Sequence, residues 1–210
     1  MSQIDPAEAQ RITLESYNTH IDEYVDKKEL LDHDRTAAYW PGVEYFLDQL
    51  PPGQTIFEVG SGSGADARRT EAAGFRVQRS DAAESFRDLL QAQGHDVLAY
   101  NVLDQPPEKT YKAILANAVL LHCNTDQFRQ AVSNLYQGLQ SQGLLCLGMK
   151  VGDFEGWREK GLSGKRYFKY WQIPDLEQEL QNAGFAVGHS YLVSDGGFAV
   201  ITATKRSSPF

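Results

Sequence analysis

The chain has 210 residues, of which 41% are hydrophobic and 23% are charged, and its formal net charge at pH 7 is −8. This composition suits one α/β domain and excludes a disordered or fibrous chain. The acidic balance argues against a broad electropositive surface for nucleic acid or anionic lipid.

The two cysteines, Cys123 and Cys146, both lie in apolar runs. This predicts buried free thiols in a reducing compartment rather than a disulfide or a zinc site. The first residues are polar and acidic, unlike a signal peptide, and no apolar run approaches the ~20 residues that a membrane span requires. We therefore expect a cytoplasmic protein that has no membrane partner.

Two helices are predicted before the Pro51-Pro52-Gly53 breaker. Asp5 followed by Pro6 is typical of a helix start. An apolar stripe at helical spacing continues this first helix, made of Leu14, Tyr17, Ile21 and Tyr24. A second helix is expected from about residue 35 to residue 50.

From residue 55 onward, short β-rich runs alternate with helical patterns. Strands are expected at residues 55–59, 75–79, 96–100, 112–117 and 144–150, and helices at 65–73, 82–93, 125–139 and 174–183. This alternation predicts a parallel sheet with helices on both faces. The runs at 185–193 and 198–204 flank Ser194-Asp195-Gly196-Gly197, a hairpin signal. The expected fold class is therefore α/β, with a single domain over residues 1–210 that ends in an antiparallel pair.

The strongest chemical signal is a glycine loop between a strand and a helix, formed by Gly60, Gly62 and Gly64. Glycines permit positive φ angles and let the backbone approach a ligand closely. The N-terminus of the following helix favours a carboxylate or phosphate. Asp81, at the end of the next strand, can accept hydrogen bonds from both hydroxyls of a ribose. The alternative is a tight turn that binds no ligand, and the presence of Asp81 argues against it.

Two kinds of nucleotide compete as the ligand of this loop. The dinucleotide fingerprint is Gly-x-Gly-x-x-Gly, whereas here the third glycine, Gly64, comes one residue early. Glu58 lies at a buried strand end, where an uncompensated charge is costly. An amino-acid-bearing nucleoside supplies an ammonium group to compensate it, and a dinucleotide does not. A NAD(P)-dependent oxidoreductase is therefore the less favoured interpretation.

The segment Glu58-Val59-Gly60-Ser61-Gly62-Ser63-Gly64 resembles the first motif of the class I S-adenosylmethionine-dependent methyltransferases of the small-molecule type. The terminal hairpin is similar to the end of that family's sheet, and the resemblance extends from about residue 17 to residue 205. It implies a Rossmann-like, seven-stranded, mostly parallel sheet. It also implies S-adenosylmethionine as the methyl donor and S-adenosylhomocysteine as the product.

The resemblance implies roles for individual residues. Glu58 would help to orient the ammonium group of the cofactor, Asp81 would hold its ribose, and Asn101 with Val102 would contact its adenine. The family usually has aspartate where this chain has Asn101. The full cofactor-binding set implied in this way is Tyr17, Glu58, Gly60, Ser61, Gly62, Gly64, Asp81, Asn101, Val102 and Asn117.

Tyr17 belongs to Ser16-Tyr17-Asn18, which resembles the N-terminal element that covers the cofactor in small-molecule methyltransferases. On that basis residues 1–50 form a helical lid. A place for Tyr17 in an ordinary helix core is the alternative.

Methyl transfer from a sulfonium needs alignment of the acceptor and exclusion of water more than it needs a catalytic group. A general base helps only where the acceptor must lose a proton. His122, just past the fourth strand, is the candidate base, because the ordinary pKa of histidine suits proton transfer. A histidine that only packs at the strand end is the alternative.

The acceptor pocket is expected near Lys150, at the end of the fifth strand, and near Arg166 and Tyr167 in the aromatic and basic segment 152–171. This segment is expected to be an insertion that folds over the pocket. The two cations suit an anionic small-molecule acceptor, and the aromatic rings would wall the pocket. A solvated loop whose aromatic side chains close the core is the alternative.

Other acceptors are disfavoured by the residues that come after the fourth strand. Asn117-Ala118-Val119-Leu120 lacks the Pro-Pro-aromatic motif of nucleic acid amino-methyltransferases, so nucleic acid is not expected as a partner. Asp126 is the only carboxylate nearby, so no metal is expected. A non-catalytic S-adenosylmethionine-binding protein remains an alternative, and the oligomeric state is open.

Overall fold

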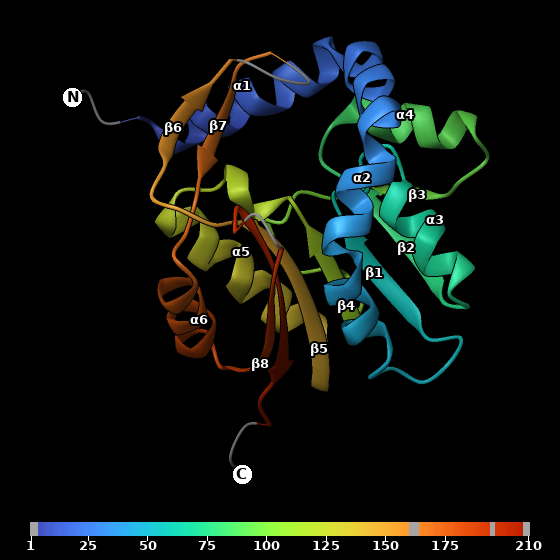
Figure 1. The fold of residues 1–210 in the computed structure, drawn as a ribbon, viewed down its shortest axis with the longest axis vertical. Coiled ribbons are helices and arrows are strands. Elements are labelled where there is room, and N and C mark those ends of the chain that lie inside the picture. Colours follow the sequence, from blue (N-terminus) through green and yellow to red (C-terminus); the bar gives the residue numbers. More distant parts are fainter. Residues whose placement is uncertain (1–3, 160–163, 194–195, 208–210) are drawn as a thin grey trace.

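The computed structural model describes residues 4–159, 164–193 and 196–207, and the side chains of these residues except 27–37. One seven-stranded sheet runs through the molecule in the order β3-β2-β1-β4-β5-β9-β8 (Figure 1). Its strands are β1 Thr55–Val59, β2 Arg76–Asp81, β3 Val97–Ala99, β4 Tyr111–Asn117, β5 Leu139–Lys150, β8 Phe185–Leu192 and β9 Phe198–Lys205. β1 to β5 pair in parallel, and β9 runs antiparallel to both β5 and β8. The predicted fold class, with its terminal antiparallel pair, is confirmed.

The helices cover both faces of the sheet (Figure 1). They are α1 Pro6–Thr19, α2 Ile21–Leu47, α3 Ala65–Ala72, α4 Glu84–Ala92, α5 Thr125–Gly138 and α6 Ile173–Asn182, with a short 3-10 helix, η1, at Leu120–His122. None of the helices described in this structure is long and apolar enough to cross a bilayer.

The core follows from the two-residue period of the strands, whose side chains alternate between the two faces. On β1, Ile56 packs in a cluster with Phe46 of α2. The next residue, Phe57, packs in the opposite cluster, which contains Phe128 of α5. Cys123 and Cys146 are buried free thiols, as predicted.

The N-terminal helices differ from their predicted bounds. The predicted stripe from Leu14 to Tyr24 is divided, because α1 ends at Thr19 and α2 begins at Ile21. His20 between them has φ −115° and ψ 30°, which is not helical. The second helix therefore starts 14 residues before the expected residue 35, and it continues through Pro41.

The segment 152–171 forms a second, two-stranded sheet from β6, Glu155–Arg158, and β7, Arg166–Lys169. A bridge between Val151 and Trp171 holds its base. Residues 160–163 of this segment, and Ser194-Asp195 of the predicted terminal turn, lie outside the described residues. Figure 1 shows that α1 and the β6–β7 hairpin lie together at the end of the sheet where the parallel strands finish.

Candidate functional site

A cavity of about 470 Å³ lies at the carboxyl ends of the parallel strands. The glycine loop after β1, the ends of β2 and β4, and the helices α1 and α2 contribute to its wall. The predicted residues that line it are Tyr17, Gly60, Ser61, Gly62, Asp81, Asn101, Val102, Asn117, His122 and Lys150. Glu58, Gly64, Arg166 and Tyr167 are not among its lining residues. Residues from separate predicted motifs therefore meet at one site.

Gly60 and Gly62 of the glycine loop supply parts of the cavity wall that carry no side chain. Gly60 has φ +68°, and an added Cβ would lie 2.5 Å from a methyl group of Val119. Gly62 has φ +53°, and an added Cβ would meet nothing within 4 Å. Gly60 is thus required by close packing, whereas Gly62 leaves open space in the cavity.

Glu58 is connected to the cavity through a neighbour. Its carboxylate is 3% exposed and accepts a short hydrogen bond from the hydroxyl of Ser61. The Ser61 oxygen also accepts a bond of 3.2 Å from the backbone N–H of Ser80 on β2. These bonds tie the loop to the first two strands and fix Ser61 in the cavity wall.

Asp81 is the acid at the end of β2. One carboxylate oxygen accepts a bond of 2.8 Å from the backbone N–H of Gly62, and the other accepts one of 2.9 Å from that of Ala83. Burial raises the pKa of this carboxyl, and the two backbone bonds oppose the rise. Each oxygen keeps a further lone pair for a ligand hydroxyl.

The amide of Asn101 closes its own turn. Its oxygen accepts bonds of 3.1 Å from the side chain of Gln10 and from the backbone N–H of Leu103, and its nitrogen donates to Asp104 at 3.0 Å. The side chain is therefore already hydrogen-bonded within the protein. Val102, the next residue, is buried and lines the cavity.

Asn117, at the end of β4, lies in a polar cluster that crosses three elements. Its amide nitrogen donates to Asp66 of α3 at 2.8 Å, and the hydroxyl of Tyr39 on α2 donates to the other oxygen of Asp66 at 2.6 Å. All three residues line the cavity. Neither Asp66 nor Tyr39 was predicted from the sequence. An acid in the first turn of the helix after the glycine loop is the signal by which Asp66 could have been found.

His122 forms hydrogen bonds through both ring nitrogens. Nδ1 lies 2.7 Å from the backbone carbonyl of Tyr167, and Nε2 lies 2.9 Å from the hydroxyl of Tyr17. A carbonyl only accepts, so Nδ1 carries the proton and Nε2 accepts from Tyr17. Burial lowers the pKa of His122 to about 3, and the nearby charge of Arg166 also lowers it. The imidazole is therefore neutral at physiological pH, and it is a weaker base than the histidine of ordinary pKa on which the prediction of a general base rested.

Arg166 and Tyr167 contact Tyr17 and His122 from the side away from the cavity. Arg166 is 7% exposed and donates to the hydroxyl of Tyr17 at 3.0 Å, and its guanidinium stacks over the rings of Tyr17 and Phe168. The hydroxyl of Tyr167 donates to Glu155 at 2.6 Å. Burial raises the pKa of Tyr17 to about 12, and Arg166 opposes that rise.

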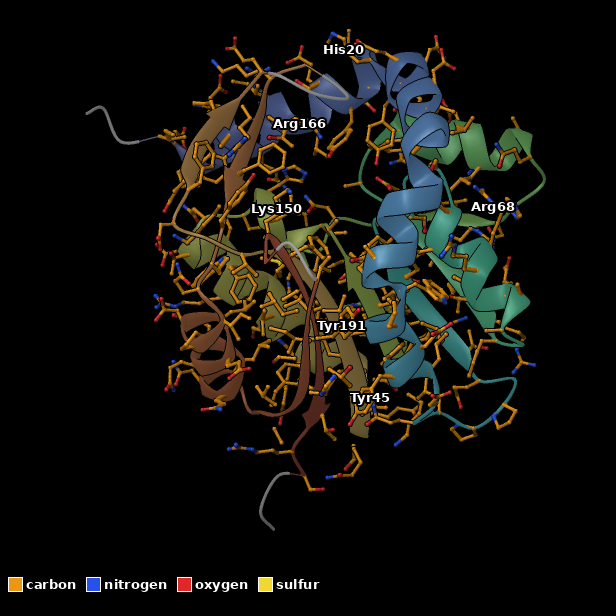
Figure 2. All side chains as sticks on the ribbon, viewed as in Figure 1. His20, Tyr45, Arg68, Lys150, Arg166 and Tyr191 are labelled. Carbon is orange, nitrogen blue, oxygen red and sulfur yellow. The ribbon has the colours of Figure 1, made fainter. Side chains whose placement is uncertain are left out.

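Lys150 is the predicted acceptor-site cation that does line the cavity. Its ammonium lies 5.5 Å from the ring centre of Tyr170. Figure 2 shows Arg166 beside α1, with Lys150 below it, towards the middle of the molecule. Cys123 also lines the cavity, and burial raises the pKa of its thiol to about 12, which keeps it neutral.

The sequence also matches the model of a known protein family. A model described as a methyltransferase domain matches residues 31–190. The chain belongs to this methyltransferase family. No curated protein sequence matches this methyltransferase.

Solved structures share the fold of the methyltransferase at low sequence identity. A Burkholderia thailandensis 1,6-didemethyltoxoflavin-N1-methyltransferase, with bound 1,6-didemethyltoxoflavin and S-adenosylhomocysteine, is 21% identical, with a TM-score of 0.74 over 99% of this chain and 93% of that one. A magnesium protoporphyrin IX methyltransferase from Synechocystis PCC 6803, with bound S-adenosylmethionine, is 17% identical, with a TM-score of 0.73 over 99% and 100% of the two chains. A complex named DhpI-SAM-HEP is 18% identical, with a TM-score of 0.74 over 97% and 99%.

Proposed function

We propose that this methyltransferase takes a methyl group from S-adenosylmethionine and transfers it to a small-molecule acceptor. The observation that carries the proposal is one cavity that joins the glycine loop to Asp81 and to the ends of β4 and β5. The neighbours crystallised with S-adenosylmethionine or S-adenosylhomocysteine support the choice of donor. The acceptor named in the Burkholderia structure supports a small molecule.

The residues present fit this cofactor. The cavity volume of about 470 Å³ falls in the ordinary range for ligand pockets, and Gly62 opens onto free space. In our proposal Gly60, Ser61 and Gly62 hold the methionine part, and Gly64 shapes the loop as the left-handed N-cap of α3. The ribose hydroxyls bind Asp81, which already faces the cavity.

The remaining cofactor contacts come from the neighbouring strand ends and from the lid. The side chain of Val102 and the turn held by Asn101 form the adenine site, and Asn117 faces the methionine part. Tyr17 on α1 covers the cofactor. S-adenosylmethionine supplies a methyl group that its sulfonium already activates, so the protein has to align the acceptor for in-line displacement and exclude water.

Where the acceptor must lose a proton, the route runs through Tyr17 to His122. The lone pair of Nε2 is occupied by the Tyr17 hydroxyl, so His122 acts on the acceptor through that hydroxyl. The acceptor proton passes to the Tyr17 oxygen as the hydroxyl proton passes to Nε2. Arg166 donates to the same oxygen, which gains one proton as it loses the other and stays neutral, so this bond serves to keep the hydroxyl proton directed at Nε2.

Lys150 is proposed as the group that binds an anionic part of the acceptor, because it is the predicted cation in the cavity wall. Arg166 and Tyr167 support the site from behind. Arg166 bonds Tyr17, and the carbonyl of Tyr167 fixes the tautomer of His122. The insertion 152–171 thus serves the acceptor site by holding its wall.

Binding and turnover can be tested separately. Isothermal calorimetry should give micromolar binding of S-adenosylmethionine and S-adenosylhomocysteine, and no binding of NAD. Preferential binding of NAD would contradict the proposal in favour of an oxidoreductase. Release of S-adenosylhomocysteine should then appear on incubation with fractionated metabolites. Tight binding without release in any fraction would favour a non-catalytic S-adenosylmethionine-binding protein.

A further inference from the structure

Asp66 is a cavity carboxylate to which the family resemblance assigned no role. It lies in the first turn of α3, directly after the glycine loop, and lines the same cavity as Gly60 and Gly62. Its two oxygens accept from the hydroxyl of Tyr39 at 2.6 Å and from the amide of Asn117 at 2.8 Å. Three separate elements therefore fix its orientation.

Among the side chains that the structure describes, none compensates the charge of Asp66. Tyr39 and Asn117 are neutral donors, and no Lys, Arg or His among the residues described in the structure forms an ion pair with Asp66. A carboxylate offers about four lone-pair sites, of which two are used here. A fixed anion with free lone pairs on a cavity wall is suited to bind a cation.

The packing of Asn117 directs its amide nitrogen towards Asp66. Its amide oxygen is buried without a hydrogen-bond partner and lies over Gly148 of β5, where an added Cβ would clash with it. Because Gly148 has no side chain, the amide oxygen of Asn117 can pack against the backbone of β5. In this position the amide nitrogen points at Asp66.

Glu58 lies differently. It is 3% exposed, is not among the cavity-lining residues, and bonds the hydroxyl of Ser61. Its carboxylate therefore lies behind Ser61 and is not itself part of the cavity wall.

We propose that Asp66 binds the ammonium group of the methionine part of S-adenosylmethionine, with Tyr39 and Asn117 as its positioning residues. The proposal rests on the proposed function. In this proposal Glu58 does not contact the ammonium group itself. It acts indirectly, because its hydrogen bond holds Ser61 and the glycine loop in place. An ammonium carries three donors, and charge-assisted bonds to a carboxylate are roughly twice as strong as neutral ones.

The test measures binding of three ligands to the full chain by calorimetry. S-adenosylhomocysteine has the amine and the carboxylate, S-adenosyl-3-thiopropylamine keeps the amine alone, and methylthioadenosine lacks both. Asp66→Asn should weaken binding of the first two by about ten-fold or more and leave methylthioadenosine within about two-fold. Asp88→Asn, at an exposed acid on α4, is the matched control and should change none of the three.

Two outcomes would overturn the proposal. One is an Asp66→Asn protein that binds S-adenosylhomocysteine as the wild type does. The other is an equal loss for all three ligands, which would mean a distorted site. A wild type that binds none of them would remove the proposed function along with this inference.

Tyr39→Phe decides the question if Asp66→Asn does not fold. It keeps the Asp66 charge and removes the 2.6 Å bond that orients it. It should weaken binding of the two amines by about three-fold or more and leave methylthioadenosine unchanged. Unchanged binding of the amines in a folded Tyr39→Phe protein would also contradict the proposal.

Discussion

The hydroxyl of Tyr17 donates a hydrogen bond of 2.9 Å to Nε2 of His122, across 105 residues of the chain. Tyr17 comes from the first helix and His122 from the 3-10 turn after β4. The pair connects α1 to the turn after β4 at the cavity wall. In the proposed mechanism, His122 therefore acts on an acceptor through the Tyr17 hydroxyl.

His122→Ala should reduce turnover by about ten-fold or more and leave the affinity for S-adenosylmethionine nearly unchanged, because general base catalysis is worth that much or more. Tyr17→Phe should cost a similar factor, and the double variant should cost little more than either single one. Single-turnover rates and calorimetry measure the two effects. Unchanged turnover in His122→Ala would remove this residue from the mechanism.

The pKa of His122 makes a prediction about stability and pH. Its folded pKa of about 3 lies below the ordinary value of about 6.5. The unfolded chain therefore binds the proton first. The stability from the neutral imidazole is complete above pH 6.5 and is lost by as much as about 1.4 kcal/mol per pH unit as the pH falls towards 3.

Urea unfolding of the wild type and of His122→Asn at pH 7.5, 6.5 and 5.5 checks this. The wild type should lose more free energy of unfolding than the variant over this range. The comparison cancels other titrating groups, such as Asp81, whose raised pKa acts in the opposite direction. Parallel losses in the two proteins would show that His122 is protonated without cost.

Arg166→Ala should lower kcat/KM for the acceptor by a far larger factor than it raises the Kd for the cofactor, since Arg166 bonds the Tyr17 hydroxyl of the proposed proton route and does not line the cavity. Arg166→Lys keeps a charged donor and should recover part of the loss. Initial-rate kinetics against both substrates give the answer. Equal effects on the two constants, or no recovery with lysine, would reject a role at the acceptor site.

The glycine loop offers a contrast between two substitutions. Gly60→Ala should destabilise the fold, because its Cβ would lie 2.5 Å from Val119. Gly62→Ala meets no atom within 4 Å, so it should cost only about 1–2 kcal/mol of backbone strain while it weakens binding of S-adenosylmethionine.

Gly53→Ala is the matched control for Gly62→Ala. Gly53 also has a positive φ and nothing within 4 Å of an added Cβ, and it does not line the cavity. Thermal melting and calorimetry should find similar stability losses in these two variants, with weaker binding only in Gly62→Ala. If the two variants bind S-adenosylmethionine with equal affinity, the ligand does not lie against Gly62.

Local signals predicted most of the sheet. β1 has the predicted bounds, and Asp81 ends β2 as expected, because strand alternation and glycine turns are written in neighbouring residues. The break at His20 could not be predicted, since no glycine or proline marks it. β5 begins at Leu139 rather than residue 144, directly where α5 ends.

Contacts between residues far apart in the chain could not be predicted from the sequence. No local pattern links Tyr17 to His122, or Tyr39 to Asp66, because these pairs meet only after the helices pack on the sheet. The β6–β7 hairpin was expected as a pocket cover. In the structure its residues hold the wall from outside, through the carbonyl of Tyr167 and the side chain of Arg166.

The backbone N–H of Tyr167 donates to the hydroxyl of Thr13 on α1, at 3.1 Å, while Thr13 also faces the cavity. A movement of α1 away from the β6–β7 hairpin would break this bond together with the bond between Tyr17 and His122. The same helix therefore covers the cavity and holds one end of the proposed proton route, so the cavity cannot open on this side while that route stays assembled.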